Sequence, residues 1–214
     1  MKTRLITIAV TAAAIPISFV AAPYPVELIL QHVPTVLGLV LLAVITIYAN
    51  PSRLSFGCLI GFFWLHLIGA RWIYSFVPYD HLSEWLTGAT LTERFGWQRN
   101  HYDRLVHFAS GLLGVAPGSE LLQRAGGMRP MGAAVTAISL VLSVGAVYEV
   151  LEWQIAILFS PAQAQAYNGQ QGDIWDPQKD LALAGLGAVI AAGLLLRWSP
   201  RRVVRSTGHS AGRH

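Results

Sequence analysis

The chain has 214 residues, of which 54% are hydrophobic and only 12% are charged. Soluble domains carry about 25% charged residues, so this composition, with a mean hydropathy of +0.49, excludes an ordinary soluble domain and indicates a polytopic helical membrane protein. The net charge of +4 comes mainly from basic ends and loops, which we interpret as a topology signal and not as a nucleic-acid-binding surface.

Apolar runs predict an all-α bundle of about six transmembrane helices that forms one domain over residues 1–198. The expected spans are 5–22, 33–49, 54–76, 102–122, 131–159 and 180–198. Residues 1–22 could instead be a cleaved signal peptide, because a basic start precedes an apolar core that ends in small residues. Pro23, Pro25 and Pro34 are expected to bracket the first loop, and residues 199–214 are predicted to be a basic, disordered cytoplasmic tail.

The longest loop is expected over residues 77–101. Within it Leu82, Trp85 and Leu86 recur at helical spacing, which predicts a segment lying flat on the membrane surface. Glycines in the fourth and sixth spans are expected to let helices pack closely, and they are Gly111, Gly114, Gly118, Gly185, Gly187 and Gly193.

The distribution of basic residues predicts the orientation. Ten Lys and Arg residues fall on the side of the N-terminus and five on the other, so both termini are expected in the cytoplasm. This orientation brings polar residues of several segments to one level near the non-cytoplasmic face, namely Arg71, Tyr74, Asp103, His107, Glu149, Glu152, Asp173, Asp176 and Asp180. Scattered charges would have no reason to share one depth, so the sequence predicts a single polar site.

Helical spacing groups these residues in pairs. Asp103 and His107 lie four residues apart, about 40° from each other around a helix, and so share a face. Glu149 and Glu152 lie three residues apart on the fifth span. Asp176 and Asp180 are four apart and share a face if the last helix begins that early. Carboxylates and imidazoles inside a membrane are costly unless they pair, bind a ligand or line a cavity.

Such a set of side chains indicates a divalent-metal site. The candidate metal ligands are Asp103, His107, Glu149, Glu152, Asp173, Asp176 and Asp180, and the first four are also catalytic candidates. A metal there could activate water or hold a phosphate, while Arg71 or Arg104 clamps an anionic headgroup. Tyr74 and Trp153 are further candidates for substrate binding, although Trp153 is also typical of an interfacial anchor.

Structural explanations stay open for each residue. Asp103 could cap a helix, His107 could be a hydrogen-bonded core histidine, and Glu149 and Glu152 could pair with Arg71 or Arg104. Two whole-protein alternatives also remain. The carboxylates could relay protons or cations in a coupled transporter, or the cluster could be a salt-bridged network in a structural subunit.

Four stretches carry a resemblance to a known family. They are LHLIGARWIYSFVP, YDRLVHFASGLLG, YEVLEW and QGDIWDPQKDLALAGLGA, and they resemble the YjdF-like bacterial inner-membrane proteins, a family of unknown function. The resemblance covers about Val33 to Leu196. It implies a multi-pass protein of the bacterial inner membrane and supplies no reaction.

A looser similarity is to the VanZ-like membrane proteins, which are associated with glycopeptide-antibiotic resistance. Matching positions are Asp103, Arg104, His107, Phe108, Glu149, Glu152, Gln154, Asp180, Leu181 and Gly187. The chain departs from that pattern at Ala184, where Asn is expected.

The sequence therefore supports one leading hypothesis. The protein is a metal-dependent enzyme or binder that acts on a lipid or lipid-linked phosphate at the outer leaflet, with membrane lipids as its surroundings and no nucleic-acid partner. Whether it is an enzyme, which metal it takes and its oligomeric state are left open by the sequence.

Overall fold

The computed structural model describes residues 1–158 and 171–198, and the regular structure in these ranges is helical. This confirms the predicted all-α class. The predicted tail, 199–214, and the last residue of the predicted fifth span lie outside the described residues. The helices are α1 (Lys2–Ser18), α2 (Pro25–Tyr48), α3 (Arg53–Arg71), α4 (Tyr79–Thr87), α5 (Leu91–Phe95), α6 (Tyr102–Gly126), α7 (Pro130–Leu158) and α9 (Asp176–Trp198).

Five of these helices are long and apolar enough to cross a membrane, namely α2, α3, α6, α7 and α9. The protein is therefore a polytopic membrane protein. The helix α1 has 17 residues, or about 26 Å at about 1.5 Å per residue, against a hydrocarbon core of about 30 Å. A sixth span and the cytoplasmic placement of both termini stay predictions.

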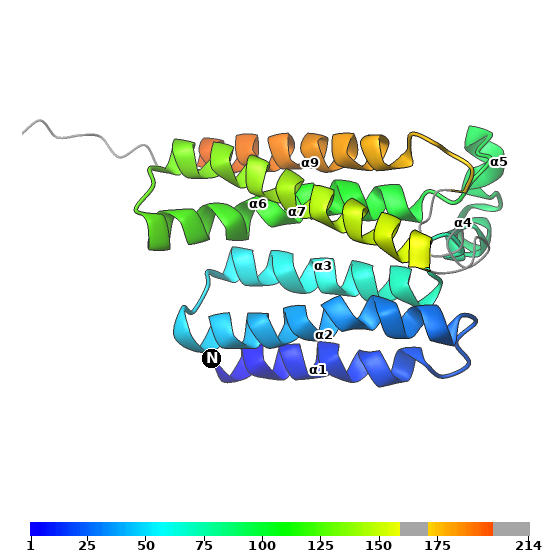
Figure 1. Ribbon diagram of the computed structural model, residues 1–214, viewed down its shortest axis with the longest axis horizontal. Helices are drawn as coiled ribbons and strands as arrows, with labels where there is room; N and C mark the ends of the chain where they lie inside the picture. The colour runs from blue at the N-terminus through cyan, green and yellow to red at the C-terminus, as the bar shows by residue number, and fades with distance from the viewer. Residues whose placement is uncertain (159–170, 199–214) are drawn as a thin grey trace, which may run out of the picture.

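The long helices lie side by side in two groups (Figure 1). One group is α1, α2 and α3, the other is α6, α7 and α9, and the contact of α3 with α6 joins them. The start of α1 and the end of α9 lie at one end of the bundle, while α4 and α5 lie at the opposite end. We call the end with α4 and α5 the site end, because α6 and α9 both begin there.

The helices α6 and α9 approach each other closely through glycine. A Cβ atom on Gly111 would lie 1.9 Å from the carbonyl oxygen of Ala184, and one on Gly187 would lie 2.2 Å from that of Phe108. Only hydrogen fits at these two positions, so the backbones touch, as small residues allow between membrane helices. The predicted close packing is thus confirmed for Gly111 and Gly187, whereas a Cβ on Gly193 would meet no atom within 4 Å and would face open space.

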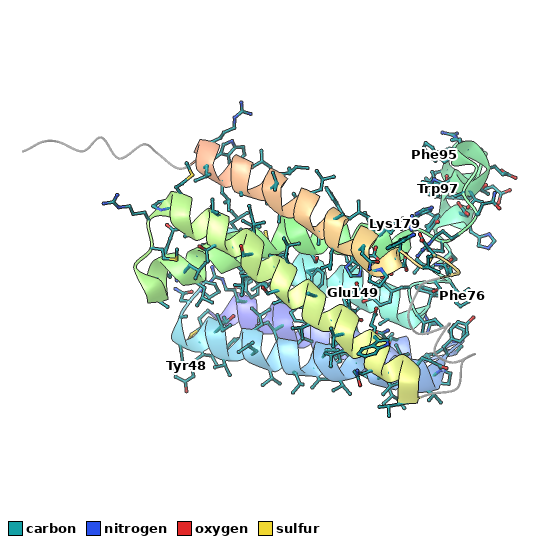
Figure 2. The ribbon with its side chains drawn as sticks, turned by 45° about the horizontal axis from the view of Figure 1, so that its top comes forward. Tyr48, Phe76, Phe95, Trp97, Glu149 and Lys179 are labelled. Atoms are coloured by element: carbon teal, nitrogen blue, oxygen red, sulfur yellow. The ribbon has the colours of Figure 1, made fainter. Side chains whose placement is uncertain are left out.

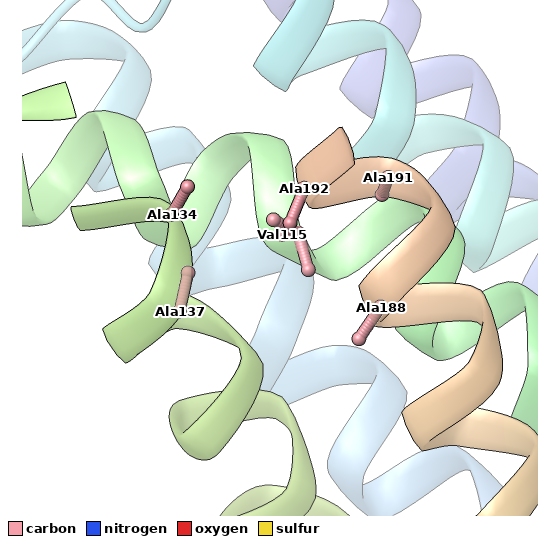
Figure 3. Close-up of a cluster of buried hydrophobic side chains, with 6 residues drawn as sticks. All are labelled: Val115, Ala134, Ala137, Ala188, Ala191 and Ala192. Carbon is pink, nitrogen blue, oxygen red and sulfur yellow. The ribbon is translucent and has the colours of Figure 1, made fainter. Parts of the chain in front are cut away.

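Small apolar side chains fill the bundle beyond this crossing, toward the end of α9. The buried cluster comprises Val115, Ala134, Ala137, Ala188, Ala191 and Ala192, from α6, α7 and α9 (Figure 3). Outer faces of α2 and α7 instead expose large apolar side chains, among them Leu37, Val40, Leu41, Val144 and Val147. A dry interior of alanines and an apolar outer surface are what a helix group in lipid requires.

The first proline-rich segment differs from its prediction as a loop. The helix α2 begins at Pro25, eight residues before the predicted start of the second span at residue 33, and it continues through Pro34. Pro25 stands at the first helical position, where a missing N–H is tolerated, and Pro34 lies inside the apolar helix. The earlier start places Gln31 and His32 inside the bundle, where both are buried.

The third helix ends five residues before its predicted end. Ile73 and Tyr74 have positive φ angles of 43° and 58°, which the helix cannot continue through. The turn is held by its contacts: the Tyr74 ring lies over Gly69, where a Cβ would be 2.5 Å from it, and the Tyr74 hydroxyl bonds to His66. Arg71 is therefore the last residue of α3.

The predicted surface segment forms two short helices, α4 and α5. Leu82, Trp85 and Leu86 on α4 are exposed, in agreement with an apolar face turned away from the bundle. Its attachment to the membrane surface stays a prediction. Asp80 ties the two helices together, because its Oδ1 accepts the backbone N–H groups of Leu91 and Thr92 at 2.9 and 3.2 Å.

Candidate metal centre

Three ligand-type side chains meet at the site end, between α6 and α9. One ligand atom from each of Asp103, His107 and Asp180 lies within 4.8 Å of the others. Asp103 and His107 come from successive turns of α6, with Oδ1 and Nε2 3.7 Å apart, and Asp180 comes from the second turn of α9. All three are buried, and Asp180 is only 1% exposed. We call Asp103, His107 and Asp180 the metal group.

The glycine crossing fixes the geometry of the metal group. Gly111 follows His107 by four residues, and Ala184 follows Asp180 by four, so the backbone contact lies one turn below the ligands on the same helix faces. A rigid contact so near leaves the two helices little freedom to slide or separate. The ligand atoms are therefore held close together by backbone packing as well as by their own interactions.

Glu149 brings a fourth ligand-type group from α7. Its Oε1 lies 3.5 Å from Nε2 of His107, and Figure 2 shows Glu149 toward the same end of the bundle as Lys179, near the start of α9. Two buried oxygens here, Oε1 of Glu149 and Oδ1 of Asp180, have no hydrogen-bond partner among the described residues. A buried carboxylate oxygen without a partner is costly unless something binds it.

This donor set suits a borderline divalent cation. Two carboxylates and one imidazole leave coordination positions open, as in catalytic metal sites with three protein ligands. Ligands held at about 2.1 Å from one ion lie up to about 4.2 Å apart, so a small inward movement of the side chains from 4.8 Å would complete the site. The metal group could therefore hold a metal ion.

A second polar layer lies beside the metal group at the site end and consists of Arg99, Arg104, Asp173 and Asp176. Arg99 bonds both carboxylate oxygens of Asp176, which is 2% exposed. Arg104 donates to Oδ2 of Asp173 at 2.5 Å, and its Nη2 also lies 3.3 Å from Oδ1 of Asp176. Asp173 and Asp176 therefore lie in ion pairs and outside the metal group.

Loop contacts hold this ion-pair layer in place. The N–H of Asn100 donates to Gln171 at 2.8 Å, and its side chain donates to the carbonyl of Val77 at 2.9 Å, which fixes the backbone beside Arg99.

A hydrogen bond from Lys179, with further ones from the Trp175 N–H and Arg104, lowers the pKa of Asp173 to about 2. The Asp173 carboxylate thus stays ionised above about pH 2.

Comparison with known proteins gives a family. A model for the family described as "Predicted membrane protein (DUF2238)" matches residues 3–201. The chain belongs to this family. It is also 34% identical over 143 residues to the inner membrane protein YjdF of Escherichia coli strain K12. That match covers 65% of this chain and 63% of the relative, which is less than two thirds of its length. No solved structure matches the chain.

The family assignment confirms the resemblance that the four sequence stretches carry. Three of these stretches supply the site itself: YDRLVHFASGLLG holds Asp103, His107 and Gly111, YEVLEW holds Glu149, and the third begins before Asp173 and reaches past Asp180. The family description gives no activity.

Two predicted substrate-binding residues have structural partners. Arg71 donates to the carbonyl oxygens of Ser18, Val20 and Ala21 and so satisfies the end of α1. Tyr74 bonds to His66 and packs in the cluster with Tyr102. Both residues lie where α3 ends, and neither belongs to the metal group.

The remaining predicted residues lie on the last part of α7. Glu152 is half-buried, and within the part of the chain that the structure describes it is outside the metal group. Trp153 is exposed, as expected for a side chain facing the membrane interface. The predicted roles of Glu152 and Trp153 in catalysis and substrate binding stay predictions.

A polar network in the first helix group is not predicted by the sequence pattern. His32 Nε2 lies 2.8 Å from the Ser18 hydroxyl, and His66 Nε2 lies 2.6 Å from the Thr35 hydroxyl. Gln31 connects this network to α7, because the Tyr148 hydroxyl donates to its Oε1 at 3.4 Å. The sequence does show polar residues at positions 31, 32 and 35 in an otherwise apolar run. They are not predicted to be buried in a helix because 31 and 32 are assigned to a loop.

Proposed function

We propose that the protein is a divalent-metal-dependent enzyme or binder of the bacterial inner membrane that acts on a lipid or lipid-linked phosphate. The observation that carries this proposal is the metal group, in which a buried carboxylate oxygen of Asp180 has no hydrogen-bond partner among the described residues. A bound cation would compensate the buried negative charge that Asp103, Asp180 and Glu149 bring together.

The position of the metal group supports a membrane-bound substrate. Asp103 and Asp180 lie in the first two turns of α6 and α9, hence near one end of two spanning helices, at the depth of a lipid headgroup. A metal there would supply Lewis-acid polarisation of a phosphate or a nucleophilic water. Glu149, beside His107 and without a hydrogen-bond partner for Oε1 among the described residues, is placed to accept a proton or complete the coordination. The relative's name supports the inner membrane as the location.

The test is the metal content of purified full-length protein. We expect about one divalent ion per chain after incubation with Mn²⁺ or Zn²⁺, and at least about a tenfold loss of affinity in Asp103→Asn, His107→Ala and Asp180→Asn. Glu84→Gln, which removes an exposed carboxylate on α4, is the matched control and should keep full occupancy. Unchanged occupancy in all three folded site variants would contradict the metal centre.

A coupled transporter is the second candidate. The hydrogen bond between Tyr148 and Gln31, and the histidines beyond it, favour this function because they continue the polar site sideways into the first helix group. The apolar cluster around Val115 and Ala188 fills the bundle beyond the glycine crossing, which argues against a path to the other end. Proton or cation flux in proteoliposomes that disappears in Glu149→Gln but not in Glu84→Gln would reverse the ranking.

A further inference from the structure

Three cationic side chains converge on a single oxygen above the metal group. Oδ2 of Asp173 lies 2.5 Å from Arg104 Nη2, 2.6 Å from Lys179 Nζ and 3.8 Å from Arg99 Nη1. Two guanidinium groups and one ammonium around one oxygen are the surroundings that proteins build for a phosphate. Among the described residues, the ion pairs of these three cations are made with two carboxylates, Asp173 and Asp176.

The carboxylate of Asp173 reaches this position from a short turn before α9. Its Oδ1 accepts the Trp175 N–H at 3.1 Å, and its backbone carbonyl accepts the Asp176 N–H at 3.1 Å. The turn therefore delivers Oδ2 to the positive end of a 23-residue helix, where anions are stabilised. Arg104 also has a spare donor, because its buried Nε has no hydrogen-bond partner among the described residues.

Exposure is graded across the layer. The Asp176 side chain is 2% exposed and that of Arg99 9%, whereas those of Asp173 and Lys179 are 18% and 49% exposed. The inner pair, Arg99 and Asp176, is thus part of the packed structure. The outer pair, Asp173 and Lys179, can be reached from outside the protein and can separate without opening the bundle.

We propose that Arg104, Lys179 and Arg99 form a binding site for the phosphate group of the substrate, and that the Asp173 carboxylate occupies this site until the phosphate displaces it. The inference rests on the proposed function and adds to it the position of the anionic group. Asp173 then acts as an internal competitor: it keeps the cations paired when no substrate is present and sets a threshold for binding.

The anion site and the metal group are neighbours along both helices. Arg104 directly follows Asp103 on α6, and Asp176, which pairs with Arg99 and Arg104, precedes Asp180 by one turn of α9. A phosphate that replaces the Asp173 carboxylate can direct another of its oxygens toward Asp103 and Asp180.

The experiment measures anion binding without the metal. Full-length protein in an uncharged detergent, stripped of metal by a chelating resin, is titrated calorimetrically with inorganic phosphate and with dioctanoyl phosphatidic acid. Asp173→Asn removes the competing charge but keeps an oxygen for the Trp175 N–H. We expect it to bind at least one of the two probes at least about tenfold more tightly than the wild type, because the site no longer has to be vacated.

The controls isolate the cations. Adding Lys179→Gln to Asp173→Asn should remove most of the gain in anion affinity. The Lys179 side chain is half-exposed, so we expect the double variant to fold. Dioctanoylglycerol, which has the same chains and no phosphate, should show no gain in Asp173→Asn. Three outcomes would each overturn the proposal. Asp173→Asn could bind neither anion more tightly than the wild type, its gain in affinity could persist when Lys179→Gln is added, or dioctanoylglycerol could show an equal gain.

The two anions also separate the source of the phosphate. A gain with phosphatidic acid alone supports a lipid headgroup, and a gain with both probes supports recognition of the phosphate group itself. Metal content is measured independently on the same variants. Asp173→Asn should retain the metal. Unchanged anion affinity in this variant would contradict the anion site but not the metal centre, and absence of bound metal would contradict the metal centre but not the anion site.

Discussion

Replacing Gly111 with alanine should destabilise the protein and weaken the metal binding that we propose for the metal group. The new Cβ would lie 1.9 Å from the Ala184 carbonyl oxygen, whereas real Cβ contacts are essentially never shorter than 3.0 Å. Because the obstructing atom is backbone, α6 and α9 must separate by about 1 Å or more. We expect a loss of unfolding free energy at the upper end of the range for overpacking, about 1–3 kcal/mol.

The same separation should affect the metal group, since Gly111 and Ala184 lie one turn from His107 and Asp180. Ligand atoms that are within 4.8 Å of one another would move apart, and metal affinity should fall by at least about tenfold. Gly187→Ala should likewise lower both the stability and the metal affinity, because its Cβ would lie 2.2 Å from the Phe108 carbonyl oxygen. Both effects can be measured by unfolding in mixed SDS micelles and by metal content.

Gly193→Ala is the matched control on the same helix. A Cβ at Gly193 meets no atom within 4 Å, so the change should be neutral or slightly stabilising, as alanine favours a helix over glycine by about 0.5–1 kcal/mol. If Gly111→Ala and Gly193→Ala unfolded at the same SDS fraction and retained equal metal, the tight crossing would not exist in the protein.

The polar, small-residue faces of α6 and α9 can be predicted from the sequence because they depend on local spacing. Asp103 with His107, and Asp176 with Asp180, are each separated by one helical turn, and a glycine or alanine follows each group one turn later. Such patterns define a helix face without knowledge of the neighbour. The contact between these two faces is seen only in the structure.

The division of the acidic residues into two layers is not accessible in this way. Asp173 and Asp176 have the same chemistry as Asp180, and only the positions of Arg99 and Arg104 decide which carboxylates become ion-paired. Arg99 belongs to the segment before α6, where Asn100 fixes the backbone through contacts with residues 77 and 171. Long-range loop contacts of this kind leave no periodic signal in a single sequence.

Errors at helix ends explain the other differences. Pro25 and Pro34 suggest a loop in the sequence, although proline is tolerated at a first helical position and inside membrane helices. That assignment hides Gln31 and His32 from a search for buried polar groups. The third helix likewise ends at Arg71, whose guanidinium bonds the carbonyls after α1, and the predicted role of Arg71 in substrate binding stays a prediction.

Loss of the Asp176 carboxylate should be the largest single destabilisation among the charged residues. Asp176 bonds Arg99 through both oxygens, and the two side chains are only 2% and 9% exposed. In Asp176→Asn the guanidinium of Arg99 loses its bidentate carboxylate but stays in the same poorly solvated place. Breaking one partner of a buried pair typically costs about 3–5 kcal/mol, and we expect a loss in that range.

The size of this loss is best measured through a double-mutant cycle, because a buried ion pair and an equally packed apolar pair can be similar in stability. Arg99→Met with Asp176→Met should therefore be more stable than either single variant, by about 1–3 kcal/mol. Lys179→Met is the matched control: its side chain is 49% exposed, and removing its ion pair with Asp173 should change stability by less than about 1 kcal/mol. Equal effects of Asp176→Asn and Lys179→Met would mean that the inner pair is solvated and that the graded layer above the metal group is wrong.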